Sequence, residues 1–210
     1  RRGAANDSRD GVVIARTAVF ALAAFLVSCA PRRETGSQEA FWNSLSALCG
    51  QAYEGRIGAK VGGGSGPDPF EGKRLVMHVR QCAATEIRVP FHVGEDRSRT
   101  WVFTRAPSGL RLKHDHRHKN GSEDSATMYG GDALGPGTAQ RQSFPADQHS
   151  KDMFVRDKIP RAVENVWVIA LEPGQKYSYG LYRPGREFRV DFDLTRPVEA
   201  PPAPWGAKEF

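Results

Sequence analysis

The sequence predicts a mainly β protein, in which an antiparallel meander closes as a barrel or packs as a two-layer β-sandwich after one short helix. From residue 73 onward, short segments alternate apolar and polar residues, as strands with one buried face do. Turn-forming pairs rich in Gly, Pro and Asn separate these segments at short intervals. About nine strands joined by tight turns are typical of all-β barrels and sandwiches.

The first 28 residues have the layout of a secretory signal. Four arginines precede the apolar run Thr17–Val27, which has eleven residues. A helix needs about 20 residues to cross a bilayer, so this run is too short to span one. Basic residues, then an apolar run, then small residues are the order expected of a signal peptide over residues 1–28.

The sequence Leu26-Val27-Ser28-Cys29 ends this region and resembles the lipobox of bacterial lipoproteins. The resemblance implies cleavage before Cys29 and lipid on its thiol, whereas an ordinary secretory signal with an incidental cysteine is the alternative. Ala30, rather than Asp, follows the cysteine, which implies export onward to the outer membrane. The expected location is therefore the cell envelope, lipid-anchored and facing the periplasm, with residues 29–39 as a tether and the membrane as a partner through Cys29.

The charge balance gives little information about other partners. Removing residues 1–28 takes away four of the 30 basic and two of the 24 acidic residues, which leaves 26 against 22. So small an excess is weak evidence for any partner. No run of Arg and Lys with interleaved aromatic residues is present, so we expect no nucleic-acid binding.

Cys49 and Cys82 are the two remaining cysteines. A pair of cysteines in an exported domain forms a disulfide by default. The alternative is a catalytic or metal-binding thiol, but neither cysteine lies in a CxxC motif or near the histidine cluster.

The domain is expected over residues 40–196. Phe41, Leu45 and Leu48 recur at helical spacing and predict a short amphipathic helix that Thr35 or Ser37 caps and Gly50 ends. Expected strands or strand-like segments then occupy residues 73–80, 86–93, 99–105, 109–118, 122–129, 139–144, 165–172, 176–182 and 187–194. Residues 197–210 are rich in proline and are expected to form a flexible tail.

One of the last hairpins defines its own register. If Pro184-Gly185 forms a tight turn, Tyr177 pairs with Phe192, Tyr179 with Val190, and Leu181 with Phe188. All six apolar residues then share one face of the sheet.

The candidate site lies around the sequence KHDHRHKNG. His114, His116 and His118 alternate along a predicted strand, so they share one face, which Leu110 and Leu112 begin. A two-residue turn at Asn120-Gly121 places the histidines opposite polar residues of the returning strand. The predicted cross-strand pairs are His118 with Glu123, His116 with Ser125, His114 with Thr127, and Leu112 with Tyr129.

Two resemblances follow from these segments. The helix before the strands and the amphipathic hairpin at the end resemble the general plan of lipocalin-like barrels, although no lipocalin sequence motif is present. The phrases HDHRH, TMYGG and FRVDFDL resemble a family of uncharacterised proteobacterial exported proteins over most of residues 40–195. The second resemblance implies no activity.

Several functions remain open at this level. The first is a binding protein that holds a small molecule in or at the mouth of the barrel, with walls formed by Trp101, Phe103, Tyr177 and Tyr179 and the histidine face as its polar end. The second is a zinc-dependent hydrolase or metal-binding protein that holds zinc through His116, His118 and Glu123. The third is a structural envelope protein. In a further alternative, the histidines form a hydrogen-bonded polar layer at the barrel rim and have no binding or catalytic role. An enzyme is the less favoured reading. The ligand-binding set comprises His114, His116, His118, Glu123, Ser125, Thr127, Tyr129 and Trp101.

Two further expectations concern residues outside this cluster. His78 and His92 lie on separate earlier strands and are expected to face solvent. Arg97, Arg99 and Arg105 could contact an anionic ligand or lie exposed.

Overall fold

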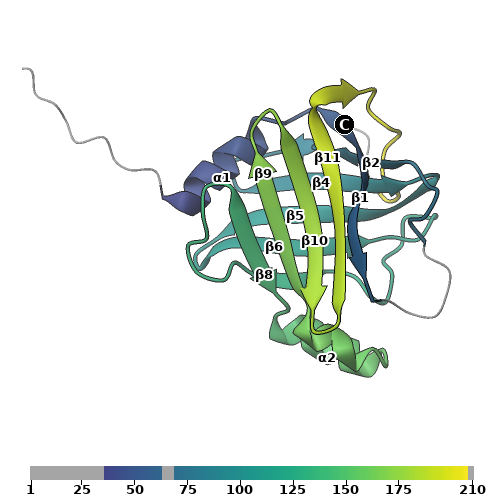
Figure 1. Cartoon of the computed structure of the whole chain (residues 1–210). Coiled ribbons are helices and arrows are strands. Elements are labelled where there is room, and N and C mark those ends of the chain that lie inside the picture. The colour runs from purple at the N-terminus through teal and green to yellow at the C-terminus, as the bar shows by residue number, and fades with distance from the viewer. Residues whose placement is uncertain (1–35, 63–68, 208–210) are drawn as a thin grey trace, which may run out of the picture. The chain divides into compact units, whose positions relative to one another are not determined.

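The computed structural model describes residues 36–62 and 69–207 (Figure 1). The predicted signal peptide, Cys29 and most of the tether lie outside the described residues. The helices are α1 (Ser37–Ser46), α2 (Gln148–Arg156) and the 3-10 helix η1 (Pro160–Glu164). The strands are β1 (Ala52–Val61), β2 (Leu75–His78), β3 (Gln81–Cys82), β4 (Glu86–Val93), β5 (Asp96–Ala106), β6 (Gly109–His116), β7 (Tyr129–Asp132), β8 (Arg141–Pro145), β9 (Val166–Glu172), β10 (Lys176–Arg183) and β11 (Arg186–Val198).

The described strands form one 11-stranded antiparallel sheet in the order β7-β6-β5-β4-β2-β1-β11-β10-β9-β8, with β3 paired to β4. Strands β9 to β11 cross β4 to β6 behind them, as expected of a sheet that curls round on itself (Figure 1). The two edge strands, β7 and β8, meet at a seam. There the Asp147 amide donates to the Gly130 carbonyl at 2.8 Å, and the Leu134 amide donates to the Ser143 carbonyl at 2.7 Å. The predicted mainly β fold is confirmed, as a nearly closed barrel.

Strand β1 connects the two halves of this sheet, and the sequence analysis missed it. It pairs with β2 on one side and with β11 on the other. A Cβ atom added at Gly55 would lie 2.6 Å from the Phe192 ring, so this position must be glycine for the core ring to fit. Glycines at such close approaches interrupt the apolar alternation by which a strand is recognised in sequence.

The β10–β11 hairpin has the register that the sequence predicted. Tyr177 pairs with Phe192, and Leu181 pairs with Phe188. Tyr177 and Phe192 are fully buried inside the barrel, where the Tyr177 ring lies beside Trp101 of β5 at a centroid distance of 5.9 Å. The apolar face that the alternation implied is therefore the inner face of the barrel.

Helix α1 covers one end of the barrel. Its buried side chains are Phe41, Trp42 and Leu45, and the Leu110 amide donates to Gln38 Oε1 at 3.0 Å. The predicted caps differ in detail. Ser37 is the first helical residue, Gly36 is the N-cap and makes no side-chain cap bond, and Thr35 lies outside the described residues. The helix ends at Ser46, before the predicted stop at Gly50.

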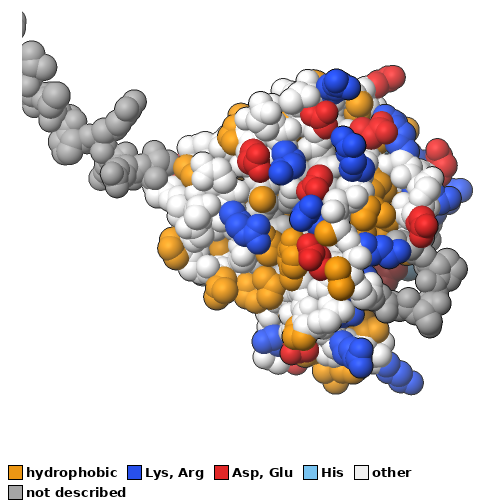
Figure 2. All heavy atoms as spheres, viewed as in Figure 1, with side chains coloured by type: hydrophobic (Ala, Val, Ile, Leu, Met, Phe, Trp, Pro, Cys, Tyr) orange, Lys and Arg blue, Asp and Glu red, His pale blue; other side chains and the backbone are white. Residues whose placement is uncertain are grey.

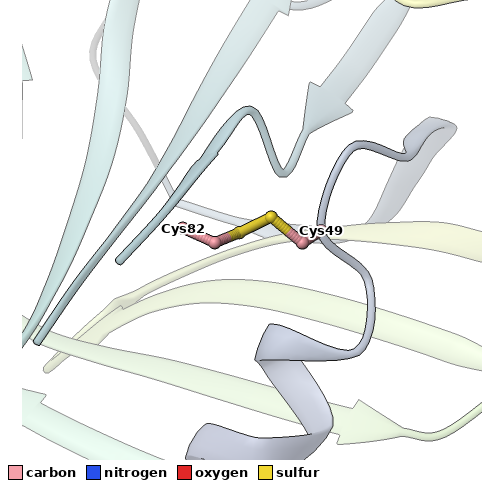
Figure 3. The surroundings of a disulfide bond; sticks show 2 residues. All are labelled: Cys49 and Cys82. Carbon is pink, nitrogen blue, oxygen red and sulfur yellow. A yellow bond between two sulfur atoms is a disulfide. The ribbon is translucent and has the colours of Figure 1, made fainter. Parts of the chain in front are cut away.

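The disulfide between Cys49 and Cys82 is present, as predicted (Figure 3). It joins the turn after α1 to the short strand β3, across a sequence separation of 33 residues. The bond therefore fixes the helix-bearing end of the chain to the sheet.

The end of the chain lies along the outside of β4 and β5. The proline-rich composition predicted a flexible tail from residue 197, but β11 continues to Val198. Beyond it, the Trp205 amide donates to the Arg97 carbonyl at 3.0 Å. Pro201 and Pro202 line a small hollow together with His92. His78 and His92 are both buried, so the expectation that they face solvent was wrong.

No helix in the described part of the chain has both the length and the apolar character that a bilayer-crossing segment needs.

Candidate binding pocket

A pocket of about 690 Å³ lies inside the barrel, at an end that α2 and η1 border. Figure 1 shows α1 and α2 at different ends of the barrel, so the pocket is remote from the end that α1 covers. Strands β4 to β7 and β9 to β11 supply its walls, and α2 and η1 supply part of its rim. The side chains that line it are those of Phe70, Phe91, Arg99, Trp101, His114, His116, Ala126, Tyr129, Phe154, Lys158, Ile159, Pro160, Arg161, Ala162, Asn165, Trp167, Tyr179, Leu181, Arg183, Arg186 and Phe188.

Eight Phe, Tyr and Trp side chains contribute to the wall. Trp101 of β5 stacks on Tyr179 of β10, with ring centroids 4.4 Å apart and planes 14° from parallel. Phe91 of β4 also stacks on Trp101, with ring centroids 5.0 Å apart. Phe70 lies 4.6 Å from Phe188. Stacked rings hold one another in fixed orientations, so this wall is a preformed apolar surface.

His114 forms the polar part of the inner end. Only 2% of this residue is exposed. Its Nδ1 lies 3.1 Å from the Tyr129 carbonyl oxygen, and its Nε2 lies 2.9 Å from the Tyr179 hydroxyl. A carbonyl can only accept, so in the neutral ring Nδ1 carries the proton and Nε2 accepts from Tyr179. Burial, and to a lesser extent the neighbouring His116, lower the pKa of His114 to about 3, so the ring is neutral near pH 7.

His116 also lines the pocket and lies nearer its mouth, the open end that α2 and η1 border. Its Nε2 lies 3.0 Å from the Tyr129 hydroxyl. Burial, followed by the positive charge of Arg99, lowers the pKa of His116 to about 4. Arg99 is the cross-strand partner of His116 on β5 and binds Asp96 at 2.5 Å. The two pocket histidines are thus neutral and hydrogen-bonded to tyrosines. They form a polar wall, and neither has the pKa near 7 that suits general acid–base catalysis.

The predicted hairpin register at the histidines was wrong. His114 pairs with Tyr129, not with Thr127, so two additional residues lie between the strands. Strand β6 ends at His116, and beyond it Arg117 bridges to Glu123.

Local side-chain bonds explain this change of register. Asn120 Oδ1 accepts from the Ser122 amide, and Asp124 Oδ1 accepts from the Ala126 amide. Each is an Asx turn, which uses backbone donors that a ladder would otherwise need. Met128 then takes a positive φ of 54° before β7 begins. The chain therefore forms a longer loop than a two-residue hairpin.

The structure brings together four of the eight predicted ligand-binding residues. His114, His116, Tyr129 and Trp101 line the pocket. Thr127 lies behind them, and its hydroxyl accepts from the His116 amide at 2.8 Å. The remaining three are not part of the pocket lining, namely His118, Glu123 and Ser125.

The predicted zinc ligands do not assemble. The His118 side chain is 56% exposed and lies near Asp124. Glu123 binds Arg117 at 3.1 Å, and His116 Nε2 is engaged by the Tyr129 hydroxyl. Within residues 36–62 and 69–207, no group of three or more His, Cys, Asp or Glu side chains could hold a metal ion. In this structure the side chains of His116, His118 and Glu123 are therefore not arranged as a metal site.

Sequence reasoning missed the basic residues at the mouth. Lys158 and Arg161 come from the segment after α2, and Arg183 and Arg186 flank the β10–β11 turn. The predicted tight turn at Pro184-Gly185 already implied that Arg183 and Arg186 face each other across the hairpin. Two arginines on either side of this turn could therefore have indicated a basic site from the sequence alone.

The comparisons with known proteins found no match for this chain among protein-family models, curated proteins or solved structures.

Proposed function

We propose that this chain is a binding protein that holds a small, largely apolar molecule in the barrel pocket. The observation that carries the proposal is the preformed hollow of about 690 Å³, whose lining includes eight Phe, Tyr and Trp side chains. Its volume is within the range of about 300–1,000 Å³ that is usual for small-molecule sites. Neutral histidines and tyrosines supply a few fixed polar groups inside it, as such sites require.

The two ends of the barrel support this reading by contrast. Toward α1, the interior is filled with fully buried side chains such as Leu45, Phe103 and Leu112. Around Trp101 and Tyr179 the same kind of interior is left open. An open apolar hollow lacks the burial of apolar surface and the van der Waals contacts that one further large side chain would provide. A ligand would recover this burial.

The test is a titration of the purified domain with the neutral apolar dye N-phenyl-1-naphthylamine, whose fluorescence rises on leaving water. We expect saturable binding to the wild type. Ala126→Trp would fill the pocket and lower the affinity at least tenfold, because Ala126 lies in its lining.

Ala84→Trp is the matched control, since Ala84 is exposed in the turn between β3 and β4. Equal dye binding by the two tryptophan variants would contradict the proposal, as would no saturable binding by the wild type of any apolar compound.

We further propose that the domain is anchored in the bacterial envelope by lipid on Cys29. The basic, apolar and small-residue order of residues 1–28 and the Leu-Val-Ser-Cys sequence support this. The Cys49–Cys82 disulfide supports export, because such bonds persist in oxidising compartments. More than one acyl chain would be needed for a stable anchor.

Mass spectrometry of the mature protein tests the anchor. We expect Cys29 as the first residue, carrying acyl chains, and release of a Cys29→Ala variant from the membrane fraction. A mature terminus at another residue, or an unmodified Cys29, would contradict it.

A further inference from the structure

The charges around the pocket are all of one sign. Of the residues that the structure describes, no Asp or Glu lines it, and the basic side chains that do are those of Arg99, Lys158, Arg161, Arg183 and Arg186. Arg99 is neutralised by Asp96 at 2.5 Å. Among the described residues, the other four have no carboxylate at ion-pair distance. Blue basic side chains also project around the lower end of the molecule in Figure 2, where α2 lies. The excess positive charge is therefore at the mouth.

Arg183 and Arg186 are directly opposed cross-strand partners at the end of the β10–β11 hairpin. Like charges at such positions destabilise a sheet. Burial, followed by the charges of Arg186 and Arg161, lowers the pKa of Arg183 below its usual value, and Glu164 opposes this only in part. Arg183 Nη1 instead donates to the uncharged Asn165 Oδ1 at 3.0 Å. The fold thus holds three mutually repelling guanidinium groups near one another.

Basic side chains elsewhere on the barrel show that the fold can place carboxylates beside arginines. Arg111 binds Asp132 at 2.5 Å, and Arg189 binds Asp191 at 3.0 Å. The guanidinium groups at the mouth have no such partner, although they border an apolar pocket. Arginine forks bind carboxylates and phosphates through paired hydrogen bonds. The arrangement of these guanidinium groups therefore suits an anion that comes from a bound ligand.

The interior polar groups define which end of a ligand lies deep. His114 and His116 are engaged with tyrosines, and Arg99 is engaged with Asp96. None of these offers a free positive charge to a buried anion. An apolar tail fits among the rings of Trp101, Phe91 and Tyr179, while a charged group belongs at the mouth.

We propose that the ligand is an amphiphilic oxyanion, with its apolar tail among the aromatic rings and its carboxylate or phosphate group at Arg161, Arg183 and Arg186. This inference rests on the proposed binding function and names the chemical class of its ligand.

The experiment is displacement of N-phenyl-1-naphthylamine by three ligands with one tail, used below their micellar concentrations: dodecanoate, dodecyl phosphate and dodecanol. We expect the wild type to bind the better of the two anions at least tenfold more tightly than the alcohol. Raising the salt concentration should weaken binding of the anion and leave that of the alcohol unchanged. Which anion binds better distinguishes a carboxylate from a phosphate ligand.

The double variant Arg183→Gln/Arg186→Gln should lose this preference and bind anion and alcohol within about threefold of each other. Arg141→Gln is the matched control, because Arg141 is exposed on β8 and is not part of the pocket lining. If the double variant fails to fold, Arg186→Gln alone carries the test, because Arg186 makes no side-chain hydrogen bond or ion pair with described residues.

Two failures are distinguishable. If the dye binds but the alcohol displaces it as well as either anion does, the oxyanion inference is overturned and the binding function stands. If neither the dye nor any dodecyl ligand binds, the binding function itself fails. An equal loss of anion affinity in Arg141→Gln would also overturn the inference, since it would assign the preference to net charge.

Discussion

Acid should destabilise this fold through its buried histidines well before its carboxylates titrate, and His92 is the residue on which this can be isolated. His92 is 4% exposed, and its Nε2 has no hydrogen-bond partner among the described residues. Burial first, and then the charges of His78, Arg97 and Arg80, lower its pKa from 6.5 to about 4 against the opposing effect of Asp96. The folded state therefore holds His92 neutral where the unfolded chain would protonate it.

The sign and size follow from this difference. The folded state binds fewer protons below pH 6.5, so the contribution of His92 to stability is complete above pH 6.5 and is lost as the pH falls toward 4. As the pH falls from 6.5 to 5, protonation of His92 stabilises the unfolded state by about 1.36 kcal/mol per pH unit. Over 1.5 pH units this lowers the free energy of unfolding by about 2 kcal/mol. The carboxylates contribute little in that window, because the pKa values of Asp and Glu in an unfolded chain are about 3.9 and 4.3.

The assay is urea unfolding followed by tryptophan fluorescence at pH 7.5 and pH 5. In the wild type we expect the free energy of unfolding to fall by several kcal/mol, since His114 and His116 are also held neutral. His92→Leu should reduce that fall by about 2 kcal/mol. His149→Leu is the control, because His149 is exposed on α2. A His92→Leu protein with the same pH dependence as the wild type would refute the reasoning.

Three further predictions concern stability. Reduction of the Cys49–Cys82 bond should lower the free energy of unfolding by about 3 to 4 kcal/mol in the chain-entropy model, measured by urea unfolding with and without reductant. Gly131→Ala should destabilise the seam by about 1 to 3 kcal/mol, because the added Cβ would lie 2.0 Å from a carbonyl oxygen of β8; an unchanged thermal midpoint would contradict this. Arg186→Gln should raise the stability by about 0.2 to 1 kcal/mol, since it removes the repulsion of Arg183, and calorimetry that shows a loss instead would oppose a binding role for the charge.

The sequence predicted the register of a hairpin where alternation and turn chemistry agreed. In β10 and β11, apolar residues alternate without interruption on both sides of a Pro-Gly turn, so only one register buries Tyr177 and Phe192 together. At the histidines, alternation was present in β6 alone. The returning chain carries Asn120 and Asp124, whose side chains bond to their own backbone and lengthen the loop, and no alternation of apolar residues revealed this.

The parts that sequence could not supply depend on contacts between distant segments. His92 alternates outward from its strand, which predicts exposure, but Pro201 and Pro202 of the proline-rich end lie beside it. Strand β1 was hidden by glycines such as Gly55 that the barrel core requires. Of the four predicted wall residues, Trp101 and Tyr179 line the pocket, whereas Phe103 and Tyr177 are not part of its lining. The contribution of α2 and η1 to the pocket required the fold.

The tryptophans provide the most direct test of the pocket as a ligand site. The chain has four, of which Trp101 and Trp167 line the pocket. Trp42 lies on α1, and Trp205 lies in the segment along the outside of the barrel. In a titration with dodecanoate followed by nuclear magnetic resonance of the indole N–H groups, the account predicts saturable shifts of the Trp101 and Trp167 signals and unmoved signals from Trp42 and Trp205. Unmoved Trp101 and Trp167 signals, or equal shifts of all four, would contradict it.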